Sequence, residues 1–293
     1  MIAVDWGGSS VRAYRLSSQG TILERRTSSA GVFESSSRPF EATLESLIGD
    51  WLAAGDSSVV MSGMIGSRRG WIEVPYQACP ARLDDLAAGR REVRWATHRA
   101  WIMPGLACRS ATGAPDVMRG EETQVAGVLG GLPDPAVICL PGTHTKWVDY
   151  ADGTIRGFRT APTGEIYRLL AEKSSLVTMP PEGPIDPVWF AAGLGRSDDA
   201  GGLLQHLFGV RAAQMIGDLG EQHAASVLSG ILIGHDVREE ARPGQLVHLL
   251  GDPSLTDLYR VALERRGVRC VLLDPDAAAY GLFALSRAIE ATA

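Results

Sequence analysis

Residues 2–13 read Ile-Ala-Val-Asp-Trp-Gly-Gly-Ser-Ser-Val-Arg-Ala. A short apolar run reaches Asp5, a turn of glycines and small hydroxyls follows at 7–10, and an alternating segment then begins. Alternation of apolar and polar residues is typical of a half-buried strand. The stretch therefore predicts two strands joined by a tight turn, and a third strand is expected at 22–28.

The same order begins again in the second half of the chain. Residues 136–140 are apolar, a Pro-Gly-Thr-His-Thr turn follows, and strands are expected at 146–150 and 155–160. When residues 8–13 are set over residues 142–147, glycine meets glycine, hydroxyl meets hydroxyl and cation meets cation. Chance likeness between two hairpins is the alternative. We interpret the pattern as a duplicated β-β-β-α-β-α lobe.

The remaining segments fit two α/β lobes of this kind. Helices are expected at 40–51, 121–129, over most of 164–241, and at 255–265 and 277–290, and strands at 58–64, 100–103, 246–250 and 268–273. Residues 65–98 are expected to be irregular.

No linker rich in proline, glycine or serine separates the two halves, so we place the boundary near residue 135. This gives an N-terminal lobe at 1–135, with the first turn and the helix expected at 121–129. A C-terminal lobe at 136–293 would hold the second turn. The last helix of the chain could pack on the N-terminal lobe.

Composition narrows the function classes. The 293 residues are 45% hydrophobic and 21% charged, with a formal net charge of −6. Acidic and basic residues are interspersed, which argues against a nucleic-acid partner. No apolar stretch approaches the roughly 18 residues of a membrane span, and the four cysteines form no Cys-x-x-Cys motif. We expect a cytoplasmic protein with reduced thiols. The sequence does not decide whether the protein forms a homo-oligomer.

The two glycine-and-hydroxyl turns have the chemistry of a polyphosphate site. Backbone N–H groups can approach phosphate closely where no side chain intervenes. The single-loop motifs GxxxxGK[ST] and GxGxxG after a strand are absent. Asp5 could meet Mg²⁺, through water, and Arg12 and Lys146 could neutralise phosphate charge. A turn-capping role for Asp5 and surface ion pairs for the two cations are the alternatives.

These motifs carry a resemblance. Residues 5–13 resemble the first phosphate motif of the sugar kinase/hsp70/actin superfamily, and residues 140–148 resemble its second. More narrowly, the chain is similar to the 2-dehydro-3-deoxygalactonokinase family over nearly its whole length. The stretches that carry this likeness are 61–67 with 70–71, 102–106, 117–124 (VMRGEETQ), 141–148 (PGTHTKWV), 158–160, 163–165 and 228–234.

The resemblance implies a fold and two cofactors. The fold would be α/β, with two duplicated actin-like ATPase (ribonuclease H-like) lobes, each a mixed five-stranded sheet with flanking helices, and a cleft between them. ATP and Mg²⁺ would be the cofactors. The residues expected to bind them are Gly7, Gly8, Ser9, Ser10, Arg12, Gly142, Thr143, His144, Thr145, Lys146, Gly251 and Ser254, with Asp5 at the metal.

One departure from the family pattern concerns the nucleotide side. The family's turn reads Gly-Thr-Ser-Leu-Thr, whereas this chain has Asp252-Pro253 between Gly251 and Ser254. Proline is well suited to open a helix. An aspartate near a nucleotide is less favourable, so nucleotide preference is open.

The resemblance also points to the catalytic base. Glu121 and Glu122 begin a helix after Arg119-Gly120, where related sugar kinases have an acidic residue that accepts the substrate hydroxyl proton. Adjacent carboxylates point about 100° apart on a helix, so one of the two should face the substrate, and we favour Glu121. The alternative is that both acids only offset the helix dipole.

A sugar-acid substrate would bring its own carboxylate, which an arginine fork binds well. Arg159, Arg68 or its neighbour Arg69, and Arg119 are the candidates, and exposed arginines without a ligand role are the alternative. Ser67 and Trp71 could also contact the substrate, although aromatic residues belong more often to the core.

Three functions are weighed. The first is an ATP-dependent kinase for the terminal C6 hydroxyl of 2-dehydro-3-deoxy-D-galactonate. The second is a kinase for another 2-keto-3-deoxy sugar acid or sugar. The third is a nucleotide-binding sensor that does not catalyse. The carboxylates at 5, 121 and 122 favour an enzyme.

Overall fold

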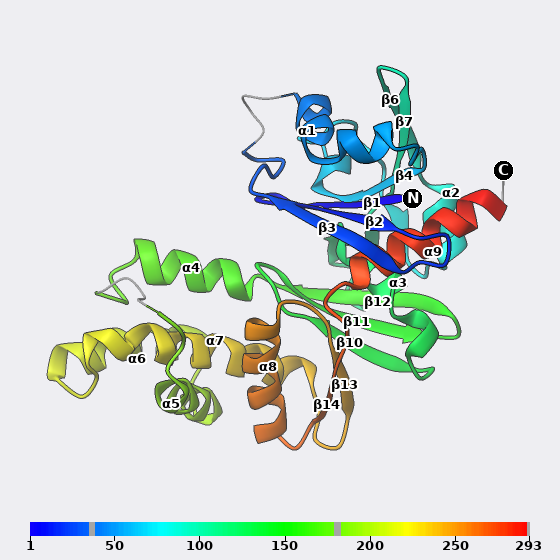
Figure 1. The fold of residues 1–293 in the computed structure, drawn as a ribbon. Helices are drawn as coiled ribbons and strands as arrows, with labels where there is room; N and C mark the ends of the chain where they lie inside the picture. The colour runs from blue at the N-terminus through cyan, green and yellow to red at the C-terminus, as the bar shows by residue number, and fades with distance from the viewer. Residues whose placement is uncertain (35–38, 179–182, 292–293) are drawn as a thin grey trace. The chain divides into compact units, whose positions relative to one another are not determined.

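A computed structural model describes residues 1–34, 39–178 and 183–291 of the chain (Figure 1). The described residues form two compact units. The first unit comprises Met1–Ala136, Val148–Arg159 and Leu273–Ala293, and the second comprises Val137–Trp147 and Thr160–Leu272. The division of the chain at residue 135, and the cleft expected between the lobes, stay predictions.

The first unit contains a six-stranded sheet of order β3-β2-β1-β4-β7-β6. β1 pairs antiparallel with β2 and parallel with β4, and β4 pairs parallel with β7. The strands are β1 (Ile2–Trp6), β2 (Val11–Leu16), β3 (Ile22–Ser28), β4 (Val59–Gly63), β6 (Arg91–Trp95) and β7 (His98–Ile102). A smaller sheet of order β5-β8-β9 joins β5 (Gln77–Ala78), β8 (Leu106–Arg109) and β9 (Pro115–Met118).

Helices complete this unit. They are α1 (Phe40–Ala53), α2 (Leu83–Ala88), α3 (Glu121–Ala126) and α9 (Ala277–Ala291). α1 buries Leu44, Ile48 and Trp51 in the same core as β1 and β4. α9 packs on α2, α3, β1 and β4, and Figure 1 shows it in red beside α3.

A second sheet has the order β12-β11-β10-β13-β14. Its parallel pairs are β10 with β13 and β13 with β14. The strands are β10 (Ala136–Leu140), β11 (Thr145–Ala151), β12 (Thr154–Ala161), β13 (Leu246–Leu249) and β14 (Arg269–Leu272). The helices of the second unit are α4 (Thr163–Lys173), α5 (Pro187–Asp198), α6 (Leu203–Ile216), α7 (Ala224–Glu240) and α8 (Pro253–Arg265).

The duplication is visible in the strand orders, because β3-β2-β1-β4-β7 corresponds strand by strand to β12-β11-β10-β13-β14. The expectation of five strands in each sheet is wrong for the first sheet, which has β6 as a sixth. Its sequence, Arg-Glu-Val-Arg-Trp, alternates, but three charged residues hide the pattern. β6 pairs antiparallel with β7, so residues 65–98 are less irregular than expected.

Two glycines of α7 lie where this helix is in close contact with α5. A Cβ atom at Gly230 would lie 2.2 Å from the carbonyl oxygen of Phe190, and one at Gly234 would lie 2.2 Å from Ser197 Oγ. α5 and α7 are therefore in close contact at both positions, through the backbone at Gly230 and through the side chain of Ser197 at Gly234.

Candidate active site

The first turn, residues 7–10, connects β1 and β2 and is held from two sides. The N–H of Gly7 donates to the carbonyl of Ser10 at 2.9 Å. The carbonyls of Gly7 and Gly8 accept from the N–H groups of Val32 and Phe33 at 3.0 and 2.9 Å. Within the described residues, the N–H groups of Gly8, Ser9 and Ser10 have no hydrogen-bond acceptor. Three consecutive donors are thus left for a ligand.

Glycine is required at Gly8 by the close approach of an aromatic ring. A Cβ atom there would lie 2.7 Å from the ring of Phe33. The guanidinium of Arg69 lies over the ring of Phe33, 4.4 Å from its centroid. This cation–π contact keeps a positive charge near the first turn.

Two carboxylates of the first unit, Asp5 and Glu121, interact with each other. Asp5 is directly opposite Arg12 in the β1–β2 register. Burial raises the pKa of Asp5, the Arg12 cation lowers it, and the charge of Glu121 raises it. Asp5 and Glu121 are therefore close enough to repel, and a cation placed between them would relieve that repulsion.

Glu122 has a different role from its neighbour. Its side chain is 1% exposed, and its two carboxylate oxygens accept from the N–H of Gly120 at 3.0 and 2.7 Å. Thr123 Oγ1 donates to it as well, at 3.2 Å. Burial, with the nearby charge of Glu121, raises the pKa of Glu122 to about 8. Glu122 thus stabilises the start of α3 from inside, while Glu121 is only partly buried and accepts from the N–H of Arg119 at 3.0 Å.

Arg119 is the candidate substrate arginine with unused donors. Its guanidinium lies 4.2 Å from the ring centroid of Tyr76, and Nη2 donates to the carbonyl of Val74 at 2.8 Å. Nε and Nη1 are buried and have no hydrogen-bond partner in the part of the chain that is described. Unsatisfied buried donors are costly, and in an active site they indicate a place for an anionic ligand.

The other substrate candidates have partners within the protein. Arg68 is highly exposed and pairs with Glu73 at 3.0 Å, and Arg159 pairs with Asp149. Trp71 packs on Trp95, with ring centroids 5.6 Å apart, at the edge of the core. These contacts give Arg68, Arg159 and Trp71 partners inside the protein, and a contact of any of them with the substrate stays a prediction. Ser67 Oγ accepts from the N–H of Arg69 at 3.3 Å, so it shapes the loop next to Arg69.

The second turn, residues 141–144, connects β10 and β11 and repeats the first. In the described residues, the N–H groups of Gly142, Thr143 and His144 also lack an acceptor. The carbonyl of Thr143 accepts from the N–H of Glu165, and His144 Nε2 lies 2.8 Å from the carboxylate of Glu165. His144 therefore helps to fasten the turn to α4.

Two residues that follow the second turn are buried. Lys146 is 3% exposed, which excludes the alternative of a surface ion pair. Thr145 is fully buried, and its Oγ1 lies 2.8 Å from the hydroxyl of Tyr259. The side chain of Thr145 thus has a partner inside the protein, and its direct contact with a nucleotide stays a prediction.

The third turn lies between β13 and α8. Gly251 has φ = 149°, and a Cβ atom there would lie 3.3 Å from the carbonyl oxygen of Pro141. Asp252 caps α8, because its carboxylate accepts from the N–H groups of Ser254 and Leu255. The hydroxyl of Ser254 donates to the same carboxylate at 2.5 Å. Asp252, where the chain departs from the family pattern, therefore caps α8. It also accepts a hydrogen bond from the hydroxyl of Ser254, a residue that we expected to bind the nucleotide.

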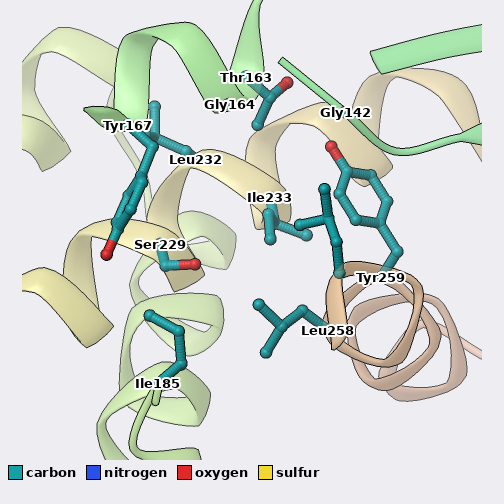
Figure 2. A pocket seen from close by; sticks show the side chains of 11 residues that line it. Gly142, Thr163, Gly164, Tyr167, Ile185, Ser229, Leu232, Ile233, Leu258 and Tyr259 are labelled. Atoms are coloured by element: carbon teal, nitrogen blue, oxygen red, sulfur yellow. The ribbon is translucent and has the colours of Figure 1, made fainter. Parts of the chain in front are cut away.

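An apolar cavity of about 100 Å³ opens beside the second turn, entirely within the second unit. Gly142 and Gly164 lie at one end, and the rings of Tyr167 and Tyr259 extend from α4 and α8 (Figure 2). Leu232, Ile233 and Leu258 are among the apolar residues that line it. Such a cavity next to three N–H donors suits a ligand with a flat apolar part and an anionic tail.

The comparisons decide the family. Residues 5–285 match the family model described as 2-keto-3-deoxy-galactonokinase. The chain belongs to this family. It is 35% identical over 300 residues to a probable 2-dehydro-3-deoxygalactonokinase of Rhizobium meliloti (strain 1021), covering 98% of this chain and 96% of that protein. It is 36% identical over 271 residues to the 2-dehydro-3-deoxygalactonokinase of Escherichia coli (strain K12), covering 91% and 90%.

Solved structures agree with the family. A crystal structure of a candidate 2-dehydro-3-deoxygalactonokinase from Sinorhizobium meliloti has a TM-score of 0.86 at 33% identity, and the alignment covers 98% of both chains. The activator of 2-hydroxyisocaproyl-CoA dehydratase from Clostridium difficile, solved with bound ADPNP, has a TM-score of 0.54 at 13% identity, covering 100% of this chain and 96% of that one. This second likeness concerns the fold alone. The predicted actin-like α/β fold class is confirmed.

Sequence reasoning missed several residues of this 2-keto-3-deoxy-galactonokinase family member. Thr163, Tyr259 and Asp236 were not predicted to belong near the second turn, and Phe33 was not predicted to contact the first. One signal was available: Asp236 lies in the apolar stretch Leu228–Val237, and a carboxylate in such a helix needs buried donors. Among the residues that the structure describes, no helix is long and apolar enough to cross a membrane.

Proposed function

We propose that the chain is a kinase that transfers the terminal phosphate of ATP to the C6 hydroxyl of 2-dehydro-3-deoxy-D-galactonate. The product would be the 6-phosphate. One observation carries the proposal: a member of the 2-keto-3-deoxy-galactonokinase family has two turns, at 8–10 and 142–144, that each hold three N–H donors without an acceptor among the described residues. Consecutive N–H groups in a turn form an anion site.

ATP would bind largely through the second unit. The triphosphate would accept from the N–H groups of residues 142–144, and the base would enter the apolar cavity beside them. The charge of Lys146 follows the turn directly and would offset the charge of the phosphates. The first turn, with Arg12 after it, offers three further N–H donors and a positive charge for phosphate.

Asp5 is the residue that would meet Mg²⁺. The chain offers a fit, because Asp5 and Glu121 repel each other and Arg12 offsets only part of the effect of burial on Asp5. Mg²⁺ keeps several waters and is bound through one or two carboxylates and the substrate phosphates. The ion would neutralise phosphate charge when bound.

Glu121 is the candidate base for the proton of the C6 hydroxyl. Its partial burial, its place at the start of α3 and the interaction with Asp5 support this role. Both oxygens of Glu122 are used in hydrogen bonds to Gly120, so Glu122 is the weaker candidate. Phosphoryl transfer depends mainly on positioning and charge, and the base orients the attacking hydroxyl.

Arg119 is the candidate ligand for the carboxylate of the sugar acid. The two buried nitrogens without a partner support this choice over the ion-paired Arg68 and Arg159. Arg69, held over Phe33, is the second arginine that the substrate could meet. A charge-assisted hydrogen bond to a carboxylate is about twice as strong as a neutral one.

The test is a coupled assay of ADP release over a panel of 2-keto-3-deoxy sugar acids and plain hexoses. We expect turnover on 2-dehydro-3-deoxy-D-galactonate that is lost when EDTA removes Mg²⁺. We also expect Arg119→Lys to raise KM for the sugar acid more than KM for ATP. Turnover on hexoses alone would overturn the substrate, and ATP binding without turnover on any sugar would identify a sensor. A cytoplasmic location and a homo-oligomer stay predictions.

A further inference from the structure

Asp236 of α7 is a buried carboxylate that receives hydrogen bonds from three other elements. Its side chain is 8% exposed. Trp147 Nε1 of β11 donates to Oδ1 at 2.9 Å, and Thr163 Oγ1 of α4 donates to Oδ2 at 2.9 Å. The hydroxyl of Tyr259 in α8 donates to Oδ2 at 2.5 Å. All three donors are neutral side chains. In these contacts the buried carboxyl group of Asp236 is therefore stabilised by hydrogen bonds and not by an ion pair.

The direction of each hydrogen bond can be worked out from the number of hydrogens. A tyrosine hydroxyl has one hydrogen, and that of Tyr259 is donated to Asp236 Oδ2. The oxygen of Tyr259 must then accept from Thr145 Oγ1, 2.8 Å away. A continuous chain of donors therefore leads from Thr145, next to the second turn, through Tyr259 to Asp236.

This network joins two parts of one ligand site. Thr145 and Trp147 flank Lys146 immediately after the turn at 142–144. Thr163 and Tyr259, in contrast, line the apolar cavity of Figure 2. Asp236 is not among the residues that line this cavity, so an effect of Asp236 on a ligand there would pass through the groups that it holds.

The start of α4 is also in direct contact with the turn. A Cβ atom at Gly164 would lie 2.4 Å from the carbonyl oxygen of Gly142. A small shift of α4 would therefore move the turn as well as the cavity wall. Thr163, the neighbour of Gly164, is the residue by which Asp236 fixes α4.

We propose that Asp236 is a positioning residue for the nucleotide: through Thr145, Thr163 and Tyr259 it holds the phosphate turn and the wall of the base cavity in one arrangement. The proposal rests on the proposed function, because it assumes that a nucleotide spans these two parts. A carboxylate suits this role since its two oxygens can accept from three converging donors. Breaking the network should loosen the nucleotide and leave the sugar-acid site of the first unit unchanged.

Thr145 offers a matched pair of variants for the test. Thr145→Val keeps the shape of the buried side chain and removes its hydroxyl, whereas Thr145→Ser keeps the hydroxyl and removes a methyl group. We expect Thr145→Val to weaken ADP binding about 5- to 10-fold by isothermal titration calorimetry, since a buried partner is left unsatisfied. Thr145→Ser should weaken it much less. In steady-state assays, KM for ATP should rise in Thr145→Val with KM for the sugar acid nearly constant.

Tyr259→Phe provides a second measurement if Thr145→Val does not fold, because it removes one hydroxyl and retains the ring. We expect it to weaken ADP binding as Thr145→Val does. Equal ADP affinity in wild type, Thr145→Val and Tyr259→Phe would overturn the positioning role, and so would a parallel rise in both KM values. If the wild-type chain does not phosphorylate the sugar acid but still binds ADP in this hydroxyl-dependent way, the proposed function fails and the positioning role remains.

Discussion

At the scale of single residues, neighbouring side chains of the same type have different roles because their burial differs. Glu121 and Glu122 are adjacent in α3, yet only Glu122 is fully buried with both oxygens bonded to backbone. The sequence places both at a helix start and favours Glu121 only slightly. Burial makes the distinction, and burial depends on the packing of α3 in the first unit, which no local pattern reveals.

This difference predicts opposite results for two conservative variants. Glu121→Gln should lower kcat by about 100-fold or more, since general-base catalysis contributes about 10²–10⁴-fold, with little change in thermal stability. Glu122→Gln can still accept from Gly120 through its amide oxygen, so kcat should fall much less. Steady-state kinetics with thermal melting of both proteins checks this. Equal kcat in Glu121→Gln and wild type would remove Glu121 from the role of base.

At the scale of elements, α3 depends on α9, which comes from the far end of the chain. A Cβ atom at Gly281 in α9 would lie 1.8 Å from the carbonyl oxygen of Thr123 in α3, and one at Gly127 would lie 2.0 Å from that of Ala277. The two helices are in backbone contact, so the position of Glu121 depends on residues more than 150 positions away in sequence.

Gly281→Ala tests this contact. The added methyl must separate the helices, and overpacking of this kind costs about 1–3 kcal/mol. We expect a lower melting temperature and a lower kcat, because α3 carries the candidate base. Gly130→Ala is the matched control, since a Cβ atom at Gly130 has no neighbour within 4 Å. A Gly281→Ala protein with the stability and kcat of Gly130→Ala would contradict the coupling.

The elements themselves were largely predictable, and the reasons for the exceptions are local. The strands of both repeats and α8 and α9 follow from apolar periodicity and from turn residues. β6, β8 and β9 were missed because charged or small residues interrupt their alternation. In the site, the two turns follow from glycine and hydroxyl chemistry. The network of Asp236 does not, since its members are up to 114 residues apart.

At the scale of the whole molecule, buried acids link the stability of the protein to pH. In the unfolded chain Glu122 has the ordinary pKa of 4.5, whereas burial raises its pKa to about 8 in the folded protein. Between these two values the folded protein binds a proton that the unfolded chain has released. Unfolding then releases that proton, so the free energy of unfolding decreases as pH rises. The contribution of the proton is fully present below pH 4.5 and is lost as pH rises through about 8.

Glu122→Gln isolates this effect, because glutamine keeps the hydrogen bond to Gly120 and does not titrate. The free energy of unfolding, measured by urea titration at a series of pH values from about 5 to about 9, should fall more steeply for wild type than for Glu122→Gln. Asp5 and Asp236 also have raised pKa values and contribute the same sign to both proteins, so they cancel in the difference. Glu290→Gln, at an exposed residue that pairs with Arg287, is the control and should keep the wild-type slope. If Glu122→Gln shows the same slope as wild type and Glu290→Gln, Glu122 is ionised in the folded protein over this range, and the hydrogen bonds from Gly120 and Thr123 outweigh its burial.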